Sequence, residues 1–139
     1  MSDLVTLTIA RLAGTSPLKL VAGLLSLNAL VAPPAGKLPA AFVIPASKAY
    51  GVNGLLNAVR QEGPESVRVV LLIASVKPQA TDAFNPVAPV EDAVRTRLLG
   101  WQPEAADGAV LLRSAQLIDL QPAFFTYEMI FFRSHTVRA

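Results

Sequence analysis

Apolar side chains recur at helical spacing in three segments of the chain and at strand spacing in the rest, which predicts a mixture of helices and strands. The predicted helices run from Ser2 or Asp3 to about Ala13, from Gly23 to Val31, and from Val90 to Leu99. Gly14 and Gly100 follow the first and third, where a glycine commonly ends a helix. In the third helix, Glu91 and Asp92 are expected in the first turn and two arginines near the end, which suits the helix dipole.

The remaining apolar segments predict strands. They are Leu18–Ala22, Ala40–Ile44, Leu55–Gln61, Val67–Val76, Ala109–Leu120 and Ala123–Ser134. We expect Pro45 to end the second strand, and residues 62–65 to form the turn of a hairpin between the third and fourth. The segment VRVVLLIASV, from Val67 to Val76, is apolar on both alternating faces, which predicts a central strand with helices packed against it.

These elements predict one α/β domain, of the α+β type, over residues 1–139. We expect a single mixed, mainly antiparallel sheet flanked by helices and ending in a long C-terminal β-hairpin. Hydrophobic residues make up 53% of the sequence and charged residues only 16%. Since a chain of this size cannot bury so many apolar side chains internally, part of them is expected in contacts between subunits.

Charge and cysteine content exclude several classes of function. The net charge of +2 is spread along the chain without a basic run, which disfavours tight, direct DNA binding. The absence of cysteine excludes disulfides, thiolate metal sites and cysteine nucleophiles. The apolar stretch Leu18–Ala32 resembles a signal peptide, but it begins too deep in the chain and is shorter than the roughly 20 residues of a membrane-spanning helix. A soluble, intracellular protein without membrane contact is expected.

The sequence offers no convincing catalytic, cofactor-binding or metal site. His135 is the only histidine and lies in what reads as a fraying polar tail. The carboxylate pair Glu62 and Glu65 is explained by a solvated turn, and Gly51–Gly54 lacks the helix that completes a phosphate-binding loop. The neighbouring Ser47 and Lys48 point in opposite directions on an extended chain. We therefore expect no enzyme and no cofactor.

The segment FFTYEMIFF holds five of the nine aromatic residues of the chain within nine positions, Phe124–Phe132. In a strand, Phe125, Tyr127, Met129 and Phe131 share one face, while Phe124, Thr126, Glu128, Ile130 and Phe132 share the other. This pattern fits a central strand buried on both faces, and it also fits an interface between subunits, where such residues are enriched. Glu128 is expected to be exposed or paired. Trp101, just beyond the third helix, is expected to fold back against Val94 or Leu98.

Taken in order, three segments and the aromatic hairpin resemble the tail terminator proteins of long-tailed bacteriophages. The segments are LPAAFVIPAS (Leu38–Ser47), VRVVLLIASV (Val67–Val76) and RTRLLGWQPE (Arg95–Glu104). The resemblance covers nearly the whole chain, although its two local signatures, PAAFVIPAS and LLGWQP, are short. Pro86 and Pro89 depart from it, because they interrupt the region where a longer third helix is expected.

The resemblance implies a structural virion protein that forms a homo-oligomer, a hexameric ring, and caps the tail tube. Such a ring stops polymerisation of the tail tube protein and offers its other face to the head-completion protein. DNA then passes through the lumen without sequence-specific binding. The implied location is the head-proximal end of the virion tail, with assembly in the host cytoplasm. Trp101, Phe124, Phe125, Tyr127, Phe131 and Phe132 are the candidate core or intersubunit contacts.

Two other interpretations stay open at this point. A head-completion or neck joining protein of the phage connector would share the size and the lack of catalytic groups. A small-molecule binding or enzymatic α/β module would need a pocket with convergent polar groups, of which the sequence gives no sign.

Overall fold

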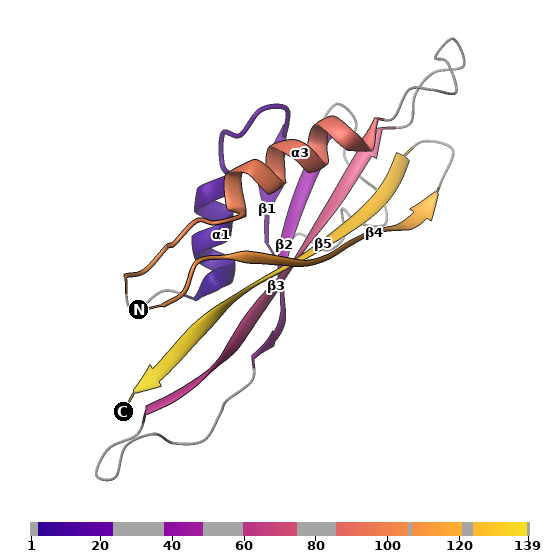
Figure 1. Cartoon of the computed structure of the whole chain (residues 1–139). Helices are drawn as coiled ribbons and strands as arrows, with labels where there is room; N and C mark the ends of the chain where they lie inside the picture. Colours follow the sequence, from indigo (N-terminus) through magenta and orange to yellow (C-terminus); the bar gives the residue numbers. More distant parts are fainter. Residues whose placement is uncertain are drawn as a thin grey trace.

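In a computed structural model, the chain forms a five-stranded sheet with the strand order β1-β2-β3-β5-β4 (Figure 1). The structure describes residues 3–23, 38–48, 60–74, 86–105, 107–120 and 124–138, of which 47, 48, 60–63 and 135–138 are described by their backbone only. The strands are β1 (Leu20–Ala22), β2 (Ala40–Lys48), β3 (Arg60–Ala74), β4 (Leu111–Leu120) and β5 (Phe124–Arg138). Only β1 and β2 are parallel, so the expected mixed, mainly antiparallel sheet is confirmed.

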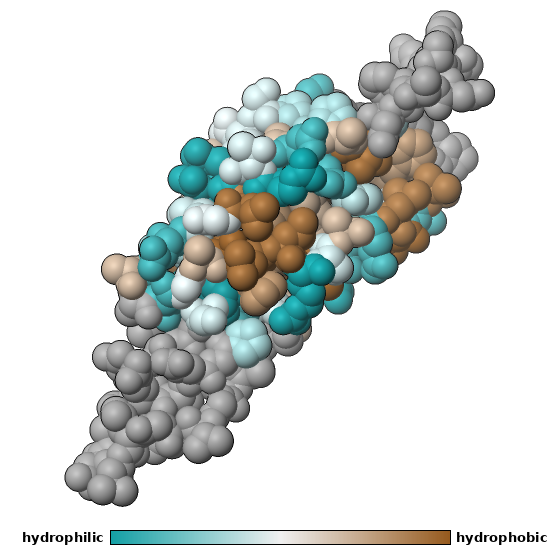
Figure 2. All heavy atoms as spheres, viewed as in Figure 1, coloured by the Kyte–Doolittle hydropathy of each residue, from teal (hydrophilic) through white to brown (hydrophobic). Residues whose placement is uncertain are grey.

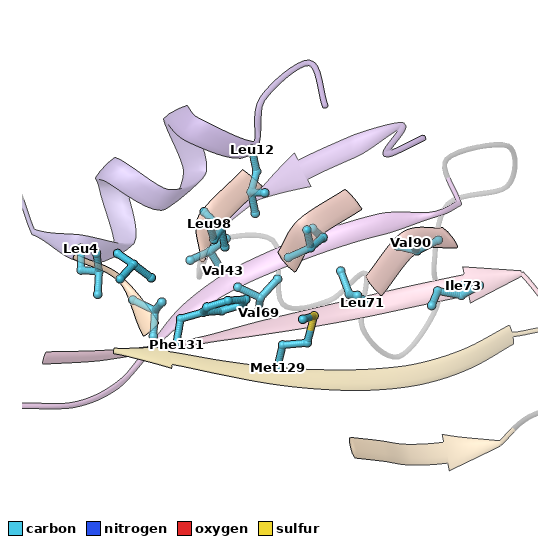
Figure 3. Packing of buried hydrophobic residues seen from close by; sticks show 14 residues of the cluster. Leu4, Leu12, Val43, Val69, Leu71, Ile73, Val90, Leu98, Met129 and Phe131 are labelled. Carbon is cyan, nitrogen blue, oxygen red and sulfur yellow. The ribbon is translucent and has the colours of Figure 1, made fainter. Parts of the chain in front are cut away.

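The two described helices, α1 (Leu4–Leu12) and α3 (Val87–Leu98), lie on the same face of this sheet (Figure 1). Asp3 caps α1 by accepting a hydrogen bond from the Thr6 N–H at 2.7 Å, and Gly14 follows it with φ of 77°. The main hydrophobic core lies between the helices and the sheet (Figure 3). Its buried members are Leu4, Leu12, Ala41, Val43, Val67, Val69, Leu71, Ile73, Val90, Val94, Leu98, Val110, Met129 and Phe131.

The opposite face of the sheet carries a second, smaller buried cluster. It consists of Ala40, Phe42, Val70, Leu72 and Phe124, and neither α1 nor α3 contributes to it. Strand β3 thus supplies buried side chains to both faces from alternate positions. It pairs with β2 on one side and β5 on the other, so the expected central strand is confirmed.

The two helices are joined at their C-terminal ends by a reciprocal pair of arginines. Arg11 Nε donates to the Arg97 carbonyl at 3.1 Å, and Arg97 Nε donates to the Arg11 carbonyl at 3.0 Å. The last carbonyls of a helix lack partners within the helix and carry its negative dipole end, so a guanidinium suits this place. Each helix therefore satisfies the end of the other.

A buried ionic cluster around Arg133 of β5 lies among the apolar core residues. The Arg133 side chain is 0% exposed. Its guanidinium is 3.0 Å from Glu65 Oε1, 2.9 Å from Glu104 Oε1 and 3.5 Å from Asp107 Oδ2. Burial lowers the pKa of this group, but the three carboxylates outweigh burial and hold the pKa above its ordinary value, so Arg133 stays charged.

Glu65 links this cluster to the first helix. Its other oxygen, Oε2, accepts a hydrogen bond from the Leu4 N–H at 3.2 Å. Leu4 is the first residue of α1, and its N–H is one of the four that have no partner within a helix. The carboxylate also lies at the positive end of the helix dipole. Glu65 therefore fixes the start of α1 on the sheet, whereas the sequence pattern had placed it in a solvated turn; that expectation is wrong.

Two turn predictions fail because pairing between distant strands overrides local turn residues. Strand β2 does not end at Pro45 but continues to Lys48, with a bulge between Pro45 and Ser47. Pro45 is exposed, and β1 pairs with β2 only as far as Phe42, so no described strand lies beside the proline on that edge.

The expected hairpin with its turn at residues 62–65 is also wrong. Those residues lie inside β3, which pairs with β5 from Arg60 to Ala74. Gly63 and Pro64 lie beyond the last pair with β2, Lys48 with Glu65, so no described strand pairs with Pro64 on that side, and a proline without an N–H is tolerated in such a position.

The start of α3 also differs from the prediction. The helix begins at Val87 rather than Val90, with Pro86 as its N-cap and Pro89 in its first turn. Prolines are tolerated there because the first N–H groups of a helix have no intrahelical acceptor. As a result Glu91 and Asp92 lie beyond the first turn, so their expected role at the helix start is wrong; both pair with Arg95 instead.

The other predictions along the chain divide into confirmed ones and ones outside the described residues. The helix from Asp3, the short strand before Gly23, and the C-terminal hairpin of β4 and β5 are confirmed. His135 lies within β5, not in a fraying tail. The expected helix over 24–31, the segment 51–54 and the turn at 121–122 fall outside the residues that the structure describes.

We predict that replacing Arg133 destabilises the fold strongly. Arg133→Met removes the positive charge shared by Glu65, Glu104 and Asp107, and it should lower the free energy of unfolding by about 3–5 kcal/mol in urea titrations. The control Lys19→Met removes a charge from an exposed side chain and should change this free energy by less than about 0.5 kcal/mol. A loss below about 1 kcal/mol for Arg133→Met would show that the cluster contributes little to stability.

Candidate interaction surface

The aromatic strand β5 divides its large side chains between the two faces of the sheet as the alternation predicts. Met129 and Phe131 are buried in the main core, and Tyr127 packs against it. Phe124 belongs to the second cluster on the opposite face and is 5% exposed. The side chains of Phe124 and Phe131 are therefore occupied by the core of this chain.

Tyr127 reaches from β5 to α3. Its hydroxyl donates to Glu91 Oε2 at 2.5 Å, and the other oxygen of Glu91 accepts a hydrogen bond from Arg95 at 2.8 Å. Burial raises the pKa of Tyr127 to about 12, the hydrogen bond and the charge of Glu91 add to the rise, and Arg95 opposes it. Tyr127 therefore stays protonated at neutral pH and ties the first half of α3 to the hairpin.

Phe132 and Phe125 are half-buried and lie on opposite faces of β5. The guanidinium of Arg113 lies 4.8 Å from the centre of the Phe132 ring, an arrangement that favours a cation–π interaction. Phe132 pairs with Leu111 of β4, and Phe125 pairs with Leu120. Both aromatic residues thus lie beside leucines of the edge strand.

Trp101 folds back onto the core cluster that contains Val94 and Leu98, as the sequence suggested. The Trp101 carbonyl accepts a hydrogen bond from the Val110 N–H at 2.7 Å, and the guanidinium of Arg11 lies 5.3 Å from the indole ring centre. These contacts hold the segment between α3 and β4 against the core and the first helix. Trp101 lies apart from the aromatic residues of β5 in the sequence, but it packs against the same core.

Glu128 is buried and paired, in agreement with its prediction. Its carboxylate is 2.7 Å from Arg68 Nε, and Gln116 Nε2 donates to its other oxygen at 3.4 Å. Arg68, on β3, keeps 43% of its side chain exposed. The pair therefore places a partly solvated cation on the face of the sheet away from the helices.

Strand β4 is an edge strand with exposed apolar side chains. Leu111, Leu117, Ile118 and Leu120 are 47%, 45%, 51% and 65% exposed. Two register shifts in its pairing with β5, at Arg113 and at Ile118, break the regular alternation of faces. Figure 2 shows apolar side chains gathered between α3 and β4 and again over the far end of β4. An edge strand of this kind is a natural surface for association.

A groove lies between α3 and β4, beside this edge. We call it the α3–β4 groove; its volume is about 420 Å³, and it is lined by Val87, Ala88, Glu91, Asp92, Leu117 and Tyr127. Its walls are apolar apart from the two carboxylates and the tyrosine hydroxyl. Tyr127, a candidate contact from the sequence, and the exposed Leu117, which was not a candidate, both line this groove.

Sequence reasoning missed the cluster of Arg133 and the exposed edge of β4. A signal for the edge was present, because the segment LLRSAQLIDL does not alternate cleanly as a half-buried strand does. The catalytic candidates are not brought together: Ser47 and Lys48 are consecutive residues of β2, and Glu65 is engaged by Arg133. In the described ranges, no group of three histidine or carboxylate side chains is placed to hold a metal ion. Nor does either described helix have the length and apolarity needed to cross a bilayer.

We predict an alkaline transition centred on Tyr127. A pKa raised from 10.0 to about 12 means that the hydroxyl contributes stability below pH 10.0, and that this contribution is lost as the pH rises through about 12. Titration of tyrosinate absorbance should show one of the two tyrosines ionising late. Tyr127→Phe should remove that late step and flatten the decline of unfolding free energy over the same interval. If both tyrosines of the wild type titrate together near pH 10.0, the contact with Glu91 is not maintained in solution.

Comparison with known proteins supports the architecture and identifies the family. No curated protein sequence matches the chain. A chain of the solved virion of a native gene transfer agent (GTA) particle shares its fold, with a TM-score of 0.59 at 10% identity, covering 99% of this chain and 96% of that one. The family model described as phage tail terminator protein matches residues 2–139. Because that match spans nearly the whole sequence, this protein belongs to the phage tail terminator family.

Proposed function

We propose that this structural tail-assembly protein forms a ring, of six copies, on the end of the tail tube. The ring ends polymerisation of the tube and offers its opposite face to the head-completion protein, which joins the tail to the head. In the virion it lies at the head-proximal end of the tail, after assembly in the host cytoplasm. The protein acts through contacts alone and catalyses no reaction.

The observation that carries this proposal is the family match over residues 2–139. The exposed edge strand supports it. Leu117, Ile118 and Leu120 place apolar surface on the strand at the edge of the described sheet, and soluble monomers usually protect such an edge. Burying these side chains against a neighbouring copy removes apolar area from water and lets the sheet edge be covered.

The charge of the chain agrees with a lumen that lets DNA pass. The net charge is +2, with twelve basic and ten acidic residues distributed along the sequence. Several described arginines are already engaged, among them Arg133 in the core and Arg11 and Arg97 at the helix ends. A lumen lined by few free cations would not hold DNA tightly, because tight binding requires many phosphate contacts.

The first test is the mass of the protein in solution and its effect on tubes. Size-exclusion chromatography with light scattering, at several concentrations, should give six times the 14.7 kDa of the chain. Purified tail tube subunits, polymerised with and without this protein, should give shorter tubes that no longer elongate when it is present. A chain that stays monomeric and leaves the distribution of tube lengths unchanged would contradict the proposal.

A second test addresses the edge of β4. Changing both Ile118 and Leu120 to serine should leave the fold intact, since both side chains are more than half exposed, and should weaken ring formation and tube capping by about tenfold or more. Leu99→Ser is the matched control, because Leu99 is 46% exposed at the end of α3. Equal loss in the control and the edge variant would point to general destabilisation rather than to an interface at β4.

A further inference from the structure

Two patches beside the β4–β5 hairpin, one on each side of the sheet, carry opposite charge. The α3–β4 groove lies on the face that carries the helices. The other face carries a patch that we call the basic face, defined by Arg68, Leu111, Arg113, Ile130 and Phe132. Both surfaces combine half-exposed apolar side chains with a small number of charges.

The α3–β4 groove is apolar at its base and acidic along α3. Leu117, which is 45% exposed, and Tyr127 line it from the hairpin. Glu91 and Asp92 line it from the helix, and both pair with the single cation Arg95. The formal charge of Glu91, Asp92 and Arg95 together is therefore −1.

The basic face is built from three strands. The sheet register places Leu111 opposite Phe132 and Arg68 opposite Ile130, so these four side chains share the face away from the helices. Arg113, at the first register shift of β4, covers the Phe132 ring. Glu128 pairs with Arg68 here, so the two arginines and this glutamate have a formal charge of +1. Asp119, opposite Thr126, lies on the same side of the sheet but at the other end of β4, outside this patch.

We infer that each copy in the ring sets its basic face against the α3–β4 groove of the next copy. This inference rests on the proposed ring and names the two surfaces that form its interface. Because the two surfaces differ, the contact between copies is head-to-tail. A pair of copies then keeps one unoccupied groove and one unoccupied basic face, so further copies can add until the ring closes. The opposite charges orient the encounter, and the burial of Leu111, Leu117 and Phe132 supplies most of the affinity.

Charge reversal tests this pairing. Asp92→Lys changes the groove from −1 to +1, so it would face a basic face of the same sign. Arg113→Glu changes the basic face from +1 to −1, with the same effect. Each variant alone should raise the concentration needed for half-assembly by about tenfold or more, measured by light scattering. Lys19→Glu, the same type of reversal at an exposed side chain outside both surfaces, should assemble like the wild type.

Recombining the two changes should restore assembly. In the double variant, a groove of +1 meets a face of −1, so the ring re-forms with the charges exchanged. An equimolar mixture of the two single variants should also form rings, in which the two kinds of copy alternate. A structural defect in either variant would not be rescued in this way, so restoration separates an interface from misfolding.

Cross-linking gives a measurement that does not depend on charge. The chain has no cysteine, so Leu111→Cys and Leu117→Cys can be introduced together without other thiols. The two positions lie on opposite faces of one strand and cannot pair within a chain. Oxidation of the double variant should therefore give a ladder of covalent oligomers up to the full ring, whereas each single variant should give no product beyond a dimer.

The outcomes separate this inference from the proposed function. Wild-type rings together with unaffected charge variants and no cross-linked ladder would overturn the pairing of these two surfaces and leave the ring in place. A wild type that neither assembles nor caps tubes would overturn the proposed function, and this inference with it. If assembly occurs only on tubes, the same variants are compared by tube capping, with the same expected loss and restoration.

Discussion

The guanidinium of Arg133 has no exposed surface, so the chain has to surround it with acceptors, and much of the geometry of the fold follows from this requirement. Glu65 is supplied by the neighbouring strand β3, and Glu104 and Asp107 by the segment that connects α3 to β4. Glu65 also accepts from the first N–H of α1. One buried cation therefore fixes a helix start, a connecting segment and the central pair of strands relative to one another.

This arrangement specifies position more than it adds stability. A buried ion pair gains little net free energy over apolar side chains of similar volume, because both charges lose their hydration. Breaking the pair is costly, however, since the remaining charges are left without a partner. Any other placement of the connecting segment would take Glu104 and Asp107 away from Arg133, and the cost of losing these two acceptors favours the observed one. Strand β4 starts directly after that segment, so the position of the exposed edge depends on the same cluster.

The sequence was sufficient for the elements whose signals are local. The cap at Asp3, the central position of β3 and the division of faces along β5 all follow from spacing and alternation within one segment. The errors in the sheet arose where pairing partners are far apart in the chain. Residues 62–65 have the composition of a turn, but β5 offers a continuous partner over the whole of β3, and the gain in backbone hydrogen bonds outweighs the local preference. Glu65 and Arg133 are 68 residues apart, and no spacing rule connects them.

The candidate surface was predictable only in part for a related reason. The aromatic segment was visible as a group, but the sequence did not separate Phe131, which the core occupies, from Phe132, which reaches the surface. That distinction depends on which face the helices cover. The exposure of the β4 leucines was harder to predict. Two register shifts change which face these side chains occupy, so the regular alternation of a strand does not apply to them.

The β4–β5 hairpin contributes side chains to both surfaces of the inferred interface, Leu117 and Tyr127 to the groove and Leu111, Arg113, Ile130 and Phe132 to the basic face. Strand β5 is held along its whole length by β3, and its faces are locked by Met129 and Phe131 on one side and Phe124 on the other. The α3–β4 groove is held to the same strand by the hydroxyl of Tyr127. The relation between the groove and the basic face therefore depends on the paired strands and on the packing of α3 against them. In a ring built from this contact, the fixed relation between the two surfaces would constrain the angle between neighbouring copies.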